Sequence, residues 1–192
     1  DAVNASMCHI HQEEFEWPWN HAEEEEILTP GEVRYSMPYN SKTVNMNSFR
    51  IKRDEALGIG TSKLKVLNYE EYLDKYVDAE YNSGEDVRGV PKFVVRAPSR
   101  ELLFVPSPKD AYEVVYEYYA TGVDMTLFSD VPEIPEQYRH TIVDGAMYYA
   151  YVFRGDMQAA GLSESKFKAG IKNMRSVNIN RTEYLRDTRV HY

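Results

Sequence analysis

The chain has 192 residues, 43% of them hydrophobic, and a formal net charge of −9. This composition excludes wholesale disorder, and the negative charge argues against a nucleic-acid-binding protein that depends on neutralising phosphates. The single cysteine, Cys8, excludes an internal disulfide framework and favours assembly in a reducing cytoplasm.

Neither a membrane span nor a signal peptide is predicted. No apolar run approaches the roughly 20 residues that cross a bilayer. The first residues also lack a basic start followed by an apolar stretch. The chain begins without methionine and inside a predicted helix, so we expect further residues upstream of Asp1.

The N-terminal segment has the apolar spacing of a helix, which we expect over residues 2–16. Pro18 ends this helix, because a proline disfavours the helical backbone of the residue before it. Trp17 and Trp19 flank that proline, and we expect them to anchor the helix end in a core. The apolar positions of the helix are Val3, Met7, Ile10 and Phe15.

A long middle segment has the short alternating patterns that are typical of β-strands. It begins with an acidic run, residues 23–26, which we expect to be solvated. A short amphipathic helix is predicted over residues 69–79 and a polar loop over 80–89. The expected strands cover residues 33–37, 44–51, 64–66, 92–96, 101–105 and 112–119, and the strands 92–96 and 101–105 form a hairpin.

Two helices are predicted near the C-terminus. Pro135 suits a first helical position, and Gly155 with Asp156 marks the end of that helix. Ser163 is expected to cap the last helix. The apolar face of that helix comprises Phe167, Gly170, Ile171 and Met174.

These elements predict an α+β fold with three parts. The N-terminal helix and the two C-terminal helices form a helical bundle from residues 1–20 and 132–177. Residues 21–131 form an inserted antiparallel β-rich module. After Val177 the chain is polar and irregular, and we expect residues 178–192 to be an extended C-terminal arm that needs a partner to become ordered.

The C-terminal arm lies in the basic part of an acidic chain. From residue 166 to 192 there are seven basic and two acidic residues, a local charge of +5, against −14 for the remainder. Such asymmetry favours docking of the arm on an acidic partner. The alternative is a solvated helix face followed by a tail that binds nothing.

No residue pattern indicates catalysis, a cofactor or a metal. Cys8, His9 and His11 lack the paired spacing of a structural zinc site. Residues 57–63 contain two glycines and a lysine but not the frame of a phosphate-binding loop, so a turn is expected there. His140 and Asp144 are interpreted as an exposed polar pair. We therefore expect no enzyme activity.

Residues 91–160 carry an ordered series of motifs: a hairpin that ends in an aromatic turn, a tyrosine-rich strand, an acidic linker and a proline-initiated helix rich in alanine and tyrosine. An upstream tryptophan motif precedes them. In this order and spacing the chain resembles the head–tail adaptor (head-to-tail connector) family of tailed bacteriophages, the short-tailed type in particular. The motif residues are Trp17 to Trp19, Leu103 to Pro108, Tyr112 to Tyr119, Asp130 to Glu133 and Ile134 to Val143.

The resemblance implies a structural subunit of the virion at the head–tail junction. It implies a homo-oligomeric ring, a dodecamer, between the portal protein ring and the tail nozzle or tail tube protein, made in the host cytoplasm and without membrane contact. DNA would pass through its channel only as transient cargo during ejection. A C-terminal arm would insert into the portal, and its expected docking residues are Arg175, Arg181, Tyr184, Leu185, Arg186 and Arg189.

An acidic channel would repel the phosphates of DNA and keep the DNA from sticking. We therefore expect carboxylates to line it, and the candidates are Glu23, Glu24, Glu25, Glu26, Glu113 and Glu117.

Two other functions remain open from the sequence. The first is a tail-associated β-rich module that binds carbohydrate through its tyrosines, of which the chain has 16. Such a module would have no use for a basic, unpacked tail. The second is a tail-associated hydrolase, which would need a carboxylate pair in a cleft.

Overall fold

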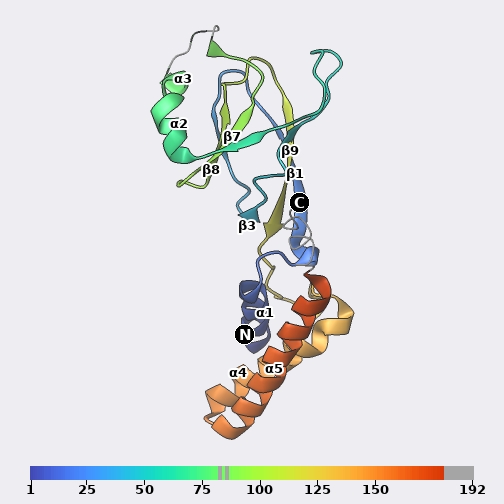
Figure 1. The fold of residues 1–192 in the computed structure, drawn as a ribbon. Coiled ribbons are helices and arrows are strands. Elements are labelled where there is room, and N and C mark those ends of the chain that lie inside the picture. The colour runs from blue at the N-terminus through green and yellow to red at the C-terminus, as the bar shows by residue number, and fades with distance from the viewer. Residues whose placement is uncertain (82–83, 85–86, 180–192) are drawn as a thin grey trace, which may run out of the picture. The chain divides into compact units, whose positions relative to one another are not determined.

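A computed structural model describes residues 1–81, 84 and 87–179 (Figure 1). The fold is α+β, as predicted, and the chain divides into two compact units. The helical unit comprises residues 1–21 and those from 120 onward, and the β unit comprises residues 22–119. Among the residues that the structure describes, no helix is long and apolar enough to span a membrane.

The elements follow the chain in this order. The helices are α1 (Ala2–Glu13), α2 (Tyr69–Lys75), α3 (Asp78–Tyr81), α4 (Arg139–Arg154) and α5 (Met157–Asn178), with 3-10 turns η1 (Pro18–Asn20) and η3 (Glu136–Tyr138). The strands are β1 (His21–Ile27), β2 (Arg34–Ser36), β3 (Ser41–Val44), β4 (Arg50–Ile51), β5 (Ser62–Lys63), β6 (Lys65–Leu67), β7 (Phe93–Ala97), β8 (Glu101–Val105) and β9 (Glu113–Ala120).

The helical unit is built on one apolar core to which α1, α4 and α5 all contribute. The tryptophan segment after α1 and the segment before α4 close this core. Its buried members are Met7, Ile10, Trp17, Ile134, Tyr138, Ile142, Phe167, Ile171 and Met174. The apolar face predicted for the last helix is therefore confirmed, because its large side chains all lie in this core.

The turn between α4 and α5 is tighter than the sequence suggested. Gly155 ends α4 with a φ of 77°, a backbone conformation that glycine adopts without a steric penalty. Asp156 then caps α5, since its Oδ1 accepts a hydrogen bond from the Ala159 amide at 3.1 Å. The predicted cap at Ser163 is wrong, because the aspartate directly after the glycine starts the helix earlier.

Residues 120–131 group with the helical unit, although the sequence assigns them to the inserted module. The side chain of Asn4 bonds to both backbone groups of Met125: its Nδ2 donates to the carbonyl oxygen at 3.0 Å, and its Oδ1 accepts from the amide at 3.1 Å. Met125 also packs against the helical core. This pair of bonds holds the linker on α1.

The β unit contains two sheets. One has the order β1-β9-β4-β5 with β3 also paired to β9, and the other has the order β2-β8-β7-β6. Aromatic rings from both sheets meet in its core: Phe49 stacks on Tyr116 at a centroid distance of 4.5 Å and lies 6.1 Å from Phe104. The predicted hairpin is confirmed as β7 and β8.

The β unit is not wholly antiparallel, in contrast to the prediction. Strand β6 pairs with β7 in parallel, with Val66 opposite Val94. A parallel pair needs a crossover connection, and α2 and α3 provide it. Tyr72 of α2 is buried against the core beside this sheet. The expected loop over 80–89 is also partly wrong, because Glu80 and Tyr81 belong to α3.

Candidate functional site

Only one of the residues predicted for the docking arm, Arg175, is described by the structure. Arg181, Tyr184, Leu185, Arg186 and Arg189 lie outside the described residues. Arg175 lies in the last turn of α5.

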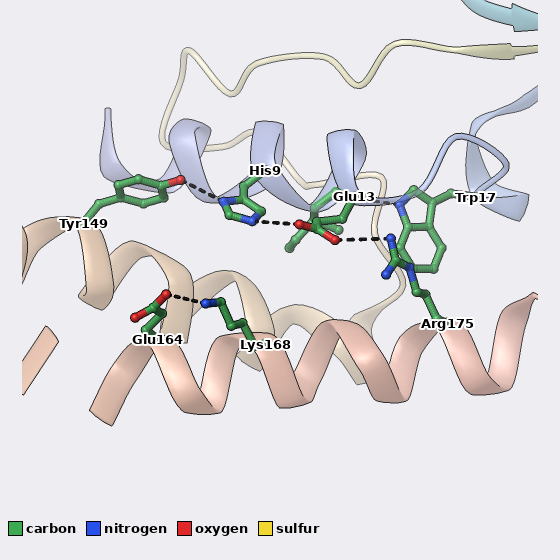
Figure 2. A network of polar contacts seen from close by, with 8 residues as sticks. His9, Glu13, Trp17, Tyr149, Glu164, Lys168 and Arg175 are labelled. Carbon is green, nitrogen blue, oxygen red and sulfur yellow. Dashed lines mark hydrogen bonds and ion pairs between the residues drawn. The ribbon is translucent and has the colours of Figure 1, made fainter. Parts of the chain in front are cut away.

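A row of polar side chains links the three large helices of the helical unit and ends at Arg175 (Figure 2). His9 Nδ1 lies 3.0 Å from the Tyr149 hydroxyl, and His9 Nε2 lies 3.4 Å from a Glu13 oxygen. The other Glu13 oxygen accepts a hydrogen bond from Arg175 at 3.2 Å, and Glu14 lies 3.4 Å from the Arg175 Nε. Arg175 therefore fastens the end of α5 to α1.

The acidic residues predicted to line a channel occur on two different faces of one sheet. The run of glutamates forms strand β1, in which exposed and half-buried residues alternate. Lys52 bridges Glu25 and Glu113 at 2.6 and 2.5 Å, so these two carboxylates share one face. Strand periodicity places Glu23 and Glu117 on that face as well.

Glu24 and Glu26 face the other side of β1. Their negative charge contributes, after burial, to raising the pKa of the Tyr116 hydroxyl, whose ring belongs to the core. Burial also raises the pKa of Glu26, with Glu24 adding to the effect. The six predicted lining residues are therefore divided between two faces of the sheet.

The face that carries Glu25 and Glu113 is not uniformly acidic. Hydrogen bonding to Lys52 lowers the pKa of Glu25, and the same contacts raise the pKa of Lys52. Arg50 lies 3.6 Å from Glu117 and is paired in register with Lys63. Carboxylates thus follow β1 and β9, whereas cations follow β4 and β5.

Sequence analysis missed a charged cluster in the β unit that centres on Arg34. Its guanidinium donates two hydrogen bonds to Glu80, at 2.5 and 3.1 Å, and one to Glu101 at 2.9 Å. The Tyr72 hydroxyl donates to Glu80 at 2.7 Å. No motif signals this cluster, because its members come from β2, α2, α3 and β8.

The charged cluster around Arg34 predicts that the unfolding free energy of the β unit falls in acid. Hydrogen bonds from Arg34, and then from Tyr72, lower the pKa of Glu80. A lowered carboxyl pKa stabilises the fold above the unfolded pKa, about 4.3, and this contribution is lost as the pH falls through the folded pKa. We expect Glu80→Gln to reduce the unfolding free energy at neutral pH by about 1–2 kcal/mol.

Urea unfolding measured at a series of pH values between about 3 and 7 checks this expectation, because this range spans the titration of carboxyl groups. The Glu80→Gln variant should show a shallower loss of stability in acid than the unchanged protein. The matched control is Glu71→Gln, which removes an exposed pair with Lys75 on α2 and should cost no more than about 0.5 kcal/mol. Equal acid profiles for the Glu80→Gln variant and the unchanged protein would contradict the role of this cluster.

The residues whose sequence pattern was compared with metal and phosphate sites make contacts of a different kind. Cys8 is exposed, and His11 Nδ1 lies 2.9 Å from the side-chain nitrogen of Asn20. Across the described part of the chain, no group of three or more His, Cys, Asp or Glu side chains is placed to hold a metal ion. Asp54 accepts hydrogen bonds from the amides of Ala56 and Leu57, which makes the glycine segment a turn, as predicted.

Two surfaces of the helical unit expose large apolar side chains, and the sequence did not single them out. We call residues 123–131 the linker loop, which exposes Val123, Leu127, Phe128 and Val131. We call the end of the α4–α5 pair, residues 152–162, the hairpin tip, which exposes Val152, Phe153, Met157 and Leu162. Figure 1 shows that this turn projects beyond the N-terminus of α1. None of these eight exposed side chains belongs to the helical core.

Comparison with known proteins gives one family. The family model described as SU10 adaptor protein matches residues 1–190. No curated protein matches the chain. The family match covers nearly the whole chain, both the helical and the β unit, and it confirms the resemblance to phage head–tail adaptors. The chain belongs to the SU10 adaptor protein family.

Proposed function

We propose that this chain is a subunit of the ring that joins the portal vertex of a tailed phage to its tail. The family match over residues 1–190 carries this proposal. A ring subunit must contact identical copies as well as the components above and below it. The exposed apolar side chains of the linker loop and hairpin tip support such contacts, because large exposed apolar surface is typical of protein–protein interfaces.

The basic C-terminal arm is the proposed attachment to the portal protein. Arg175 anchors the end of α5 to Glu13 and Glu14. It is thus part of the helical unit and fixes the point from which the arm continues. We therefore assign docking to the residues after Val177, with Arg181, Arg186 and Arg189 supplying the positive charge.

Electron microscopy of the purified protein mixed with the portal ring of its phage tests the proposal. We expect a second tier with the rotational symmetry of the portal. A variant truncated after Val177 should leave the portal ring bare, because it lacks the proposed docking residues. Circular dichroism of this variant is the control. The truncation removes none of the buried core residues, but it removes Asn178, the last residue of α5, and Ile179, which packs against the core, so the helical signal must be shown to persist. If the full chain forms no second tier on the portal ring, the proposal is wrong.

The same reconstruction tests the proposed channel lining. We propose that the edge of the sheet formed by β1 and β9, with Glu23, Glu25, Glu113 and Glu117, faces the DNA. Arg50 of β4 and Lys52 directly after it contact these carboxylates on the same face. Because β4 follows β9 in the sheet, an arrangement with β1 nearest the DNA would place these two cations farther from the channel axis, where they attract phosphate less. A ring in which Arg50 and Lys52 lie nearest the axis would contradict this assignment.

A further inference from the structure

The linker loop presents its apolar side chains from a preorganised backbone. Asp130 Oδ2 accepts hydrogen bonds from the amides of Thr126 and Leu127, both at 2.7 Å. The Asp130 amide donates back to the Leu127 carbonyl oxygen at 3.1 Å. Asn4 holds the preceding residue, Met125, on α1. A loop already fixed in this way loses little conformational entropy when it docks, so its exposed side chains suit an interface.

The hairpin tip exposes apolar side chains for a different reason. The turn at Gly155 follows α4 directly, and every residue from 152 to 158 is exposed. The side chain of Phe153 is 92% exposed. The helical core of the same unit uses none of these residues. The tip is therefore a projecting apolar surface without a partner in its own core.

The linker loop and the stretch of α5 beside the hairpin tip carry opposite charge. Residues 121–133, which contain the linker loop, include three acidic residues and no basic residue. The hairpin tip, residues 152–162, has one basic and one acidic residue, and residues 163–172 of α5, which follow it, have three basic and one acidic residue. Opposite charge favours contact between the two surfaces, whereas two linker loops would repel each other.

We propose that the linker loop of one copy docks on the hairpin tip of the next copy. The inference rests on the proposed ring function and identifies the surfaces that the ring uses. Because the two surfaces differ, each copy offers one to each neighbour, which is the head-to-tail contact that a closed ring requires. Leu127 and Phe128 would supply the apolar contacts from the loop, and Phe153, Met157 and Leu162 those from the tip.

Cysteine crosslinking on the portal ring tests this contact. In a Cys8→Ser background, Phe128→Cys is made in one batch and Phe153→Cys in another, and the two are mixed with the portal before a short bismaleimide is added. Both phenylalanines are exposed, so neither change removes a core side chain. In an equal mixture a copy has the complementary variant as its relevant neighbour half of the time, so we expect up to about half of the chain to shift from monomer to a covalent dimer that contains one copy of each variant. The double variant should give a ladder of higher covalent oligomers.

Matched controls separate this contact from random collision. The native Cys8 is also exposed, so a protein that keeps it, mixed with the Phe128→Cys variant, should remain monomeric. Phe128→Cys alone should do the same. Dimers of two Phe128→Cys copies, or a crosslink to the portal protein in place of the neighbour, would overturn the inference.

Microscopy of the same samples distinguishes a failure of the proposed contact between copies from a failure of the proposed adaptor function. A second tier on the portal without the crosslinked dimer would overturn the proposed contact and leave the adaptor function standing. If the unmodified protein forms no tier, the adaptor function fails, and the inference fails with it.

Discussion

Trp17→Ala should destabilise the helical unit by about 3–5 kcal/mol, the usual cost of removing a buried tryptophan. The side chain of Trp17 is 0% exposed and lies in the core beside Ile10. Its indole N–H donates to the Ile10 carbonyl oxygen at 2.9 Å, and its ring stacks on Trp19 at a centroid distance of 4.6 Å. The substitution therefore leaves a cavity and also removes the hydrogen bond to one of the last carbonyls of α1, which have no partner within the helix.

Urea unfolding followed by helical circular dichroism measures this loss. Trp17→Phe separates the two contributions, since it keeps most of the ring but not the hydrogen bond; we expect it to cost about 1–3 kcal/mol. The control is Phe153→Ala, which removes an exposed aromatic side chain of α4 and should change the stability by no more than about 0.5 kcal/mol. Equal effects of Trp17→Ala and Phe153→Ala would show that Trp17 does not anchor the core.

The sequence predicts this anchor because the spacing of apolar residues within one element indicates which face of that element is buried. Proline between two tryptophans ends the first helix, and helical spacing identifies Phe167, Ile171 and Met174 as a buried face. Alternation identifies β9, in which Val114, Tyr116 and Tyr118 are buried. In each case one element buries one face, so the period of the apolar residues is sufficient.

Contacts between distant segments are not encoded in such periods. Asn4 holds Met125 across the helical unit, and Arg34 pairs with Glu80 across the β unit. Neither contact produces a local pattern. The sequence therefore places residues 120–131 in the inserted module, whereas they group with the helical unit, and it predicts a loop at Glu80, which belongs to α3. The parallel pairing of β6 with β7 was missed for the same reason, since it depends on how α2 and α3 return the chain.

The candidate site shows the same division. Residue type predicted the basic charge of the arm and the acidic charge of β1 and β9. It could not predict that Lys52 lies between Glu25 and Glu113, because the lysine comes from the segment directly after β4, which is distant in sequence from both carboxylates. The apolar linker loop and hairpin tip also escaped the sequence analysis. The sequence does not distinguish an exposed phenylalanine from a buried one, because burial depends on the tertiary packing around the side chain.

Gly145→Leu should destabilise the helical unit by about 3 kcal/mol or more, at the upper end of the cost of overfilling a packed core. A Cβ atom at Gly145 would lie 2.2 Å from the Ser6 hydroxyl oxygen and 2.6 Å from the Phe167 ring. Ser6 is fully buried and donates to the Ile142 carbonyl oxygen, and Phe167 is part of the core, so neither can move aside cheaply. The larger side chain must therefore push α1 and α5 away from α4.

Gly161→Leu on α5 provides the matched control for this prediction. A Cβ at Gly161 would meet nothing within 4 Å, and a leucine favours the helix over a glycine by about 0.5–1 kcal/mol. The same chemical change should thus lower the urea midpoint of the helical transition at position 145 and raise it slightly at position 161. If both variants unfold at the same urea concentration, the helices are not packed closely at Gly145. That result would contradict a single core shared by α1, α4 and α5.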